Sequence, residues 1–201
     1  MKAAHVLLIV TAATGLAGCT TPGGPPVEVT RFHLDPPLER GTLSVEAASN
    51  GDGSSLEFQT YATPIRDALL AQGYAAPATG TTPQYVAIVT LGREAREGPP
   101  KPPKFSIGIG GGFGGGYHSG VGVGGDVAFP IGRRAPDTIV GTQLSVQIRR
   151  RSDGTVIWEG RARTEAIEQS AGGQPDQIAA KLTNALFLGF PGETGRTITV
   201  K

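Results

Sequence analysis

Residues 142–163 constrain the fold more than any other stretch of the chain. Apolar and polar side chains alternate there on both sides of a Ser152-Asp153-Gly154 turn signal. A period of two places alternate side chains on opposite faces of a strand, and Asp-Gly favours a tight connection. The stretch therefore predicts a β-hairpin with one buried face. On its other face and turn we expect solvated charges with weak cross-strand ion pairs, namely Arg149, Arg151, Glu159, Arg161 and Arg163.

Four further strands are predicted from alternating or continuous apolar runs. They cover residues 27–34, 41–48, 84–91 and 197–200. Residues 84–91 are apolar on both faces, which predicts a position inside a sheet rather than at its edge. His33, at the end of the first strand, is expected on an edge strand as a solvated side chain.

Two helices are predicted, over residues 56–72 and 174–187, because apolar residues recur there at three- and four-residue spacing. Ser54 followed by Glu57 fits a capping box for the first helix, and Gly73 is its stop signal.

Pro64 complicates the first helix, because a proline inside a helix loses a hydrogen bond and costs about 3 kcal/mol. A kinked helix over residues 56–72 is favoured. The alternative is a shorter helix over residues 64–72, with Pro64 in its first turn.

The order of these elements predicts an α+β fold, with an antiparallel or mixed sheet and two helices packed on one face. Helices on both faces would need β-α-β alternation, which the order of elements does not suggest. We expect a single α+β domain over residues 27–201, carrying a glycine-rich insert at residues 105–131.

The N-terminus has the layout of a secretory signal: a basic Lys2, an apolar run over residues 5–14, then small residues and a cysteine. The apolar run is too short to cross a hydrocarbon core, which needs about 20 residues. The four residues that follow it resemble the bacterial lipobox; they are Leu16, Ala17, Gly18 and Cys19. An ordinary signal peptide with a cysteine near its cleavage site is the alternative.

The lipobox resemblance implies that residues 1–18 are cleaved and that Cys19 carries diacylglycerol and a further acyl chain such as palmitate. Residues 19–26 then form the lipidated cysteine and a Pro- and Gly-rich tether, so the membrane is a partner through the lipid. Residue Thr20 is not the Asp that tends to retain Gram-negative lipoproteins in the inner membrane. The expected location is the outer membrane, facing the periplasm.

Composition argues against several other functions. The chain has 18 Lys and Arg against 17 Asp and Glu, so no basic surface draws nucleic acid. Cys19 is the only cysteine, and neither His33 nor His118 has a second ligand at metal spacing, so no metal or other cofactor is expected. The sequence contains no Gly-x-Ser-x-Gly, Ser-x-x-Lys or His-Glu-x-x-His motif, and its Asp and Glu residues suggest no particular catalytic pair, so we expect no enzyme and no catalytic residues.

Residues 105–131 are rich in glycine, and their larger apolar residues all fall at odd positions. In an extended chain that phase puts them on one face. One interpretation is a mobile surface insert, because glycine weakens strands. The other is a β-arm, residues 105–109 paired with 121–127, that docks on a partner or the membrane. A Gly-x-Gly-x-x-Gly match within this tract has no β-α-β context, so no nucleotide is expected.

Three aromatic residues, Phe58, Tyr61 and Trp158, are candidates for a ligand pocket or an interface, although aromatics at this spacing are more often core. Trp158 also belongs to a wider pattern that resembles the Gram-negative lipoproteins catalogued as domain of unknown function 4136. The motifs carrying this resemblance are the lipobox, Ala68-Leu69-Leu70-Ala71-Gln72-Gly73-Tyr74, Tyr85-Val86-Ala87-Ile88, the glycine-rich insert, Val156-Ile157-Trp158-Glu159-Gly160-Arg161-Ala162 and Phe190-Pro191-Gly192.

The resemblance implies an α+β envelope lipoprotein with no assigned activity. Two functions follow as expectations. The first is a non-enzymatic structural or accessory component that binds an envelope protein. The second is a periplasmic module that binds a lipid or a glycan.

Overall fold

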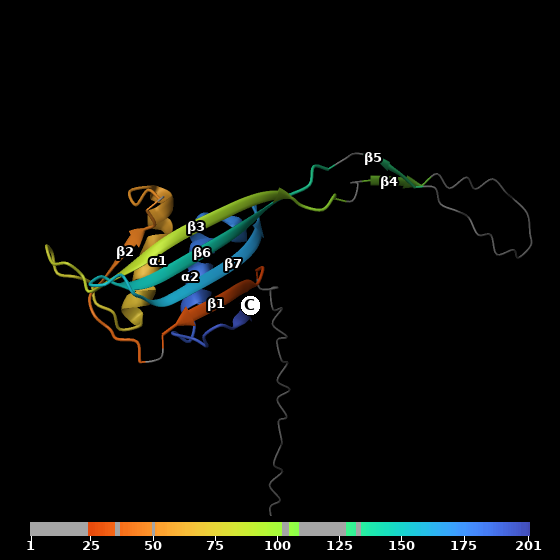
Figure 1. The fold of residues 1–201 in the computed structure, drawn as a ribbon. Helices are drawn as coiled ribbons and strands as arrows, with labels where there is room; N and C mark the ends of the chain where they lie inside the picture. The colour runs from red at the N-terminus through yellow and green to blue at the C-terminus, as the bar shows by residue number, and fades with distance from the viewer. Residues whose placement is uncertain (1–23, 35–36, 50, 102–104, 109–127, 132–133) are drawn as a thin grey trace, which may run out of the picture.

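The computed structural model describes residues 24–34, 37–49, 51–101, 105–108, 128–131 and 134–201 (Figure 1). The lipobox, Cys19 and His118 lie outside these residues. The elements in chain order are β1 (Val27–His33), β2 (Leu43–Ala47), α1 (Leu56–Ala71), β3 (Tyr85–Glu97), β4 (Phe105–Gly108), β5 (Ala128–Ile131), β6 (Thr138–Arg150), β7 (Val156–Ile167), the 3-10 turn η1 (Ala171–Gly173), α2 (Pro175–Phe187) and β8 (Thr197–Val200).

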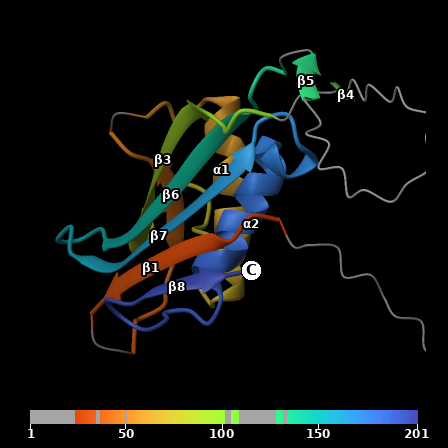
Figure 2. The ribbon, with the colours of Figure 1, turned by 90° about the vertical axis from the view of Figure 1, so that its right-hand side faces the viewer.

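The main sheet has six strands in the order β2-β3-β6-β7-β1-β8. All neighbours are antiparallel except β2 and β3, which run parallel, so the sheet is mixed. Figure 2 shows α1 and α2 side by side on the same face of the sheet. The α+β class predicted from sequence is confirmed.

The parallel pairing of β2 with β3 corrects the expectation that the order of elements contains no β-α-β unit. Parallel neighbours need a crossover connection, and α1 supplies it, so β2, α1 and β3 form one β-α-β unit. The predicted order already had a helix over residues 56–72 between strands 41–48 and 84–91, but it did not show that these two strands are parallel neighbours.

The predicted hairpin is present as β6 and β7, and both strands extend beyond residues 142–163. Gly154 adopts φ +72° in the turn, as the turn signal requires. The expected alternation fails at one place: Val156 is 36% exposed while Ile157 is 4% exposed. The register shifts between Ile148 and Arg149, and this bulge interrupts the two-residue phase.

Strand β3 lies inside the sheet, as predicted, but runs six residues beyond Leu91 to Glu97. On one side it pairs with β6 along its whole length, to Glu97 opposite Thr138. On the other side β2 covers it only as far as Val89, which lies opposite Ala47.

Helix α1 is the longer of the two predicted versions and contains Pro64. Its N-cap is Ser55, whose Oγ accepts a hydrogen bond from the Phe58 amide at 3.0 Å, so the prediction of Ser54 was wrong by one residue. Ser54 instead donates its amide and hydroxyl to Asp52 Oδ1. Gly73, at φ +92°, ends the helix as expected.

Helix α2 follows the prediction closely, with Gln174 as N-cap. Its apolar stripe is buried; the residues are Ile178, Leu182, Ala185 and Leu186. Within the residues that the structure describes, no helix has the length and apolar character needed to cross a membrane.

Strand β1 is not an edge strand, because β8 pairs with it on the side away from β7. This corrects the expectation for His33. Its ring nitrogens lie 2.7 Å from the Leu34 carbonyl oxygen and 3.1 Å from that of Gly192, so the side chain is held by the backbone rather than freely solvated.

The glycine-rich segment contains a second, two-stranded sheet, β4 with β5. Residues 105–108 pair with 128–131 rather than with 121–127, so the predicted pairing was wrong. The pairing follows from a backbone hydrogen bond nearer the main sheet, in which the Gly98 amide donates to the Asp137 carbonyl oxygen at 2.7 Å. Phe105 and Ile131 lie almost equally far along the chain from this bond, so they meet. Phe105 lies opposite Ile131, and Ile107 opposite Phe129, so odd positions do pair with odd positions. Residues 109–127 lie outside the described residues.

Candidate functional site

The three aromatic candidates lie in two different places. Phe58 and Tyr61 line a groove between the start of α1 and the outer half of β3, the part from Thr90 to Glu97 that extends beyond β2. Trp158 is not among the lining residues; it is fully buried beside α2. The sequence could not separate these positions, because each aromatic has the spacing of a core residue.

The groove has a volume of about 390 Å³, within the usual range for small-ligand sites. It opens where β2 ends and the chain turns away from β3 into the loop before α1. Leu91 and Phe58, both partly buried, give it an apolar lining, and Val89 and Tyr61 are buried beneath. Burial raises the pKa of the Tyr61 hydroxyl.

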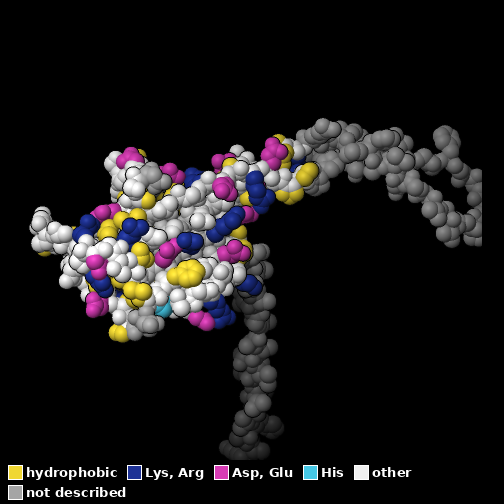
Figure 3. Space-filling view, viewed as in Figure 1, with side chains coloured by type: hydrophobic (Ala, Val, Ile, Leu, Met, Phe, Trp, Pro, Cys, Tyr) yellow, Lys and Arg dark blue, Asp and Glu magenta, His cyan; other side chains and the backbone are white. Residues whose placement is uncertain are grey.

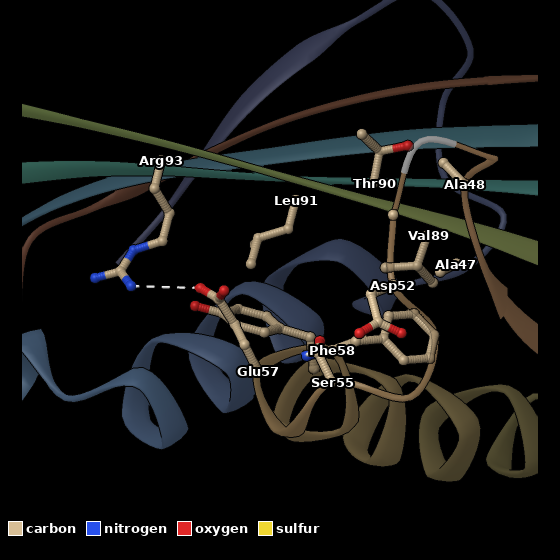
Figure 4. Close-up of a pocket in the computed structure, with 12 residues that line it drawn as sticks. Ala47, Ala48, Asp52, Ser55, Glu57, Phe58, Val89, Thr90, Leu91 and Arg93 are labelled. Carbon is tan, nitrogen blue, oxygen red and sulfur yellow. Dashed lines mark hydrogen bonds and ion pairs between the residues drawn. The ribbon is translucent and has the colours of Figure 1, made fainter.

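Charged groups lie at both ends of the groove (Figure 4). At one end Arg93 Nη1 lies 3.4 Å from Glu57 Oε1, and both side chains are substantially exposed. At the other end Asp52 accepts two hydrogen bonds from Ser54, which hold the pKa of its carboxyl below its usual value. The groove therefore combines an apolar floor with a polar rim. Sequence reasoning missed Arg93, because β3 was expected to end at Leu91. Glu57 was considered only for a helix cap, and Asp52 was not singled out.

The lining residues include no histidine or cysteine, and no cluster of three potential metal ligands occurs in the described ranges. The Asp52 carboxylate is hydrogen-bonded to Ser54, and Glu57 forms an ion pair with Arg93. The apolar floor and charged rim suit the binding of a small amphipathic group.

Trp158 belongs to an aromatic cluster that fills the space between β7, α2 and the loop before β8. Its ring stacks on Phe187 with centroids 5.5 Å apart, and Phe190 lies 5.1 Å away. Its Nε1 donates to the Pro191 carbonyl oxygen at 3.0 Å. Two motif segments far apart in sequence, around Trp158 and around Pro191, thus meet in the core. Trp158 has a structural role here rather than lining a pocket.

Arg31 is a further buried polar residue that sequence reasoning missed. It shares the inward face of β1 with Val27 and Val29 and is only 5% exposed. Its Nε and Nη2 donate to the carbonyl oxygens of Leu186 at 2.9 Å and Ala185 at 2.8 Å. These carbonyls belong to the last turn of α2 and have no partner within the helix, so Arg31 caps the helix. Burial lowers the pKa of its guanidinium.

The outer face of the sheet, opposite the helices, is polar. Figure 3 shows basic and acidic side chains interspersed over it. Short ion pairs link several of them, including Arg96 with Glu165 at 2.7 Å and Arg161 with Glu159 at 2.5 Å. The charges thus alternate in sign over this face.

The likenesses to solved structures are remote. A PDZ domain protein from Parabacteroides distasonis has a TM-score of 0.43 and 11% identity over 88% of this chain, which spans 39% of that protein. A PelC dodecamer structure from Paraburkholderia phytofirmans has a TM-score of 0.37 and 12% identity, over 78% of this chain and 93% of that one. Neither supports an inference about function.

Comparison of sequences shows to which family the chain belongs. No family model matches the chain. The uncharacterized protein ZMO1243 of Zymomonas mobilis is 30% identical to it over 213 aligned residues, which cover 88% of this chain and 80% of the relative. The chain therefore belongs to the family that includes this Zymomonas protein.

Proposed function

We propose that this chain is a lipoprotein of the bacterial envelope, anchored through Cys19, that acts as a non-enzymatic structural or accessory component of an envelope complex. The observation that carries the proposal is the Leu16-Ala17-Gly18-Cys19 motif directly after a short apolar run. The resemblance to domain of unknown function 4136 supports the same class. The proposed location is the outer membrane, facing the periplasm.

The start of the domain bears on how closely an anchored protein would approach the bilayer. Thr164 Oγ1 contacts the carbonyl oxygens of Pro25, at 3.5 Å, and Pro26, at 3.0 Å, and Lys181 Nζ also donates to that of Pro25. The last residues of the expected tether are thus bound to the domain. Only residues 20–24 remain between Cys19 and the domain, a reach of about 20 Å at 3.3–3.6 Å per residue. An anchored domain would lie against the membrane surface.

Lipidation can be tested directly. The full chain is expressed in a Gram-negative host, and the mass of the mature N-terminal peptide is measured after membrane fractionation. The expected result is an acylated Cys19 as the first residue, with the protein in the outer membrane fraction. The variant Cys19→Ser should lose the acyl mass, and Thr20→Asp should move the protein towards the inner membrane. An unmodified thiol on a protein in the soluble fraction would contradict the proposal.

A second function is favoured by the groove beside Phe58. Its apolar floor and charged rim fit a lipid or glycan fragment. A ligand that binds only the folded protein raises its melting temperature. We expect envelope lipids or peptidoglycan fragments to raise it for the wild type and for Leu188→Ala, which changes an exposed residue outside the groove, but not for Phe58→Ala. Equal shifts in all three proteins would exclude this groove as the site.

A further inference from the structure

The outer half of β3 is a strand edge without a partner in the described part of the chain. Pairing with β2 ends at Val89, yet β3 continues to Glu97 (Figure 1). Residues 92–97 are all exposed. An unpaired edge presents a row of backbone donors and acceptors to which another strand can add.

The hydrogen bonds of β3 show which residues face this edge. The Tyr85 amide donates to Thr42 O at 2.9 Å and Val89 O accepts from Ala48 at 3.0 Å, so odd-numbered residues of β3 face the β2 side. Because the backbone has a period of two, the amides and carbonyls of the later odd residues face the open edge. Those residues are Leu91, Arg93, Ala95 and Glu97.

The side chains of this edge have a self-complementary order of charge, Arg93-Glu94-Ala95-Arg96-Glu97. In an antiparallel pairing of two copies centred on Ala95, Arg93 of each copy lies opposite Glu97 of the other. Glu94 likewise lies opposite Arg96. Every charged residue of the segment thus meets its opposite, and the odd residues that face the edge pair with each other, as the ladder requires.

Neighbouring registers lack this complementarity. Moving the pairing by two residues in total keeps the hydrogen-bonding phase but places either Glu94 opposite its own copy or Arg96 opposite its own copy. Like charges directly opposite each other are destabilising. Within each copy, Arg93 pairs with Glu57 and Arg96 pairs with Glu165. Glu94 and Glu97 form no ion pair with any residue that the structure describes.

We propose that the segment Arg93–Glu97 is the interface of a homodimer, in which the β3 strands of two copies pair antiparallel about a two-fold axis at Ala95. The axis is perpendicular to the sheet, so the two sheets become continuous and the helices of both copies stay on one face. Backbone hydrogen bonds supply the affinity, and the charges select the register. The ladder is short, so the dimer is a weak one that forms at high protein concentration.

The inference does not depend on the lipid anchor. If the chain is anchored, a two-fold axis perpendicular to the sheet allows both tethers to reach one bilayer only when the sheet lies parallel to the membrane. The tests therefore use the full chain with Cys19→Ser, which carries no lipid and no other thiol. Failure of the dimer and failure of the anchor are then separate results.

Disulfide trapping tests the register. In this pairing the two Ala95 residues form a hydrogen-bonded pair, whose Cα atoms are about 5.5 Å apart, within the range of disulfides. Ala95→Cys should therefore give a covalent dimer on mild oxidation. Thr90→Cys is the control: it is exposed on the same strand, but the two copies would lie about 33 Å apart. We expect at least about tenfold more dimer from Ala95→Cys. Equal yields would overturn the proposal.

Charge reversal tests the complementarity. An acidic variant carries Arg93→Glu and Arg96→Glu, and a basic variant carries Glu94→Arg and Glu97→Arg. Each alone places like charges opposite each other in every pair and should be monomeric, whereas an equimolar mixture restores all opposite pairs. Sedimentation velocity at about 0.1–0.5 mM, where weak interfaces are populated, should show dimer for the wild type and for the mixture only.

Circular dichroism of each charge variant checks that it folds. If a charge variant does not fold, the trapping yields of Ala95→Cys and Thr90→Cys, which leave the charges unchanged, still test the proposal. Three outcomes would contradict the proposal: a wild type that stays monomeric throughout this concentration range, a mixture with no more dimer than its components, or charge variants that dimerise alone.

Discussion

The indole of Trp158 occupies the space directly above the Cα of Gly160. A Cβ built on Gly160 would lie 2.3 Å from Cη2 of Trp158 and 2.7 Å from Cδ1 of Leu186. Trp158 and Gly160 lie on the inward face of β7, two positions apart. Glycine at this position lets the ring lie flat over the strand and still reach Pro191.

Replacing Gly160 by alanine should therefore destabilise the fold. Because the neighbours are a large ring and a buried leucine, the added methyl group forces them apart, at a cost of about 1–3 kcal/mol. Urea unfolding followed by the fluorescence of Trp158, the only tryptophan, measures this directly. Gly172→Ala is the matched control, because a Cβ there meets nothing within 4 Å. A Gly160→Ala protein as stable as this control would show that the ring is free to move aside.

Arg31 gives a second prediction. Arg31→Met retains much of the apolar stem but leaves the carbonyl oxygens of Ala185 and Leu186 without their donors. We expect a loss of about 1–3 kcal/mol, the usual cost of unpaired buried polar groups. Arg161→Met should change stability by less than about 0.5 kcal/mol, because that side chain is 57% exposed and makes one surface ion pair. Equal effects of the two changes in thermal unfolding would argue against the capping role.

The sequence predicted the elements of this fold better than their contacts. The β6–β7 hairpin and α2 were found because alternation and helical spacing report burial directly. The parallel pairing of β2 with β3 depends on which strand edge α1 leads the chain to, which no local pattern encodes. The polar half of β3 was missed for a related reason: its residues are exposed, and only pairing with β6 makes them a strand.

The candidate site shows the same division. Phe58 and Tyr61 were selected as aromatic residues, but only the tertiary fold separates them from Trp158. Arg31 could have been suspected from its phase, since it continues the inward positions of Val27 and Val29. Its partners, the end carbonyls of α2, are more than 150 residues away in sequence and could not be inferred.

The start of α1 offers a third prediction, which separates two neighbouring serines. Ser55 Oγ accepts from the Phe58 amide, so Ser55→Ala should cost about 1 kcal/mol, as is usual for loss of an N-cap. Ser54→Ala should cost less, because Ser54 only contacts Asp52 within an exposed turn. The comparison is made by thermal unfolding. A larger loss of stability for Ser54→Ala than for Ser55→Ala would instead support Ser54 as the N-cap, as expected from sequence.

The hairpin turn gives a prediction about pH. Asp153 accepts a hydrogen bond from the Thr155 amide at 3.0 Å and pairs with Arg150, and these contacts hold the pKa of its carboxyl below its usual value. A carboxyl whose pKa is lower in the folded than in the unfolded state stabilises the fold above the unfolded pKa. That contribution is lost as the pH falls through the folded pKa.

Asp153→Asn removes this titration. The free energy of unfolding should therefore be higher for the wild type than for the variant, and the difference should be largest near about pH 6. The difference should shrink as the pH falls below about 4, the unfolded pKa of aspartate. Glu165, whose carboxyl pKa is lowered mainly by its hydrogen bond from Arg96, titrates in both proteins and cancels in the comparison. Urea midpoints measured from about pH 6 down to about pH 2.5 test this. A difference that stays constant over the range would mean that the Asp153 carboxylate, although bonded in the turn, does not stabilise the folded chain through its charge.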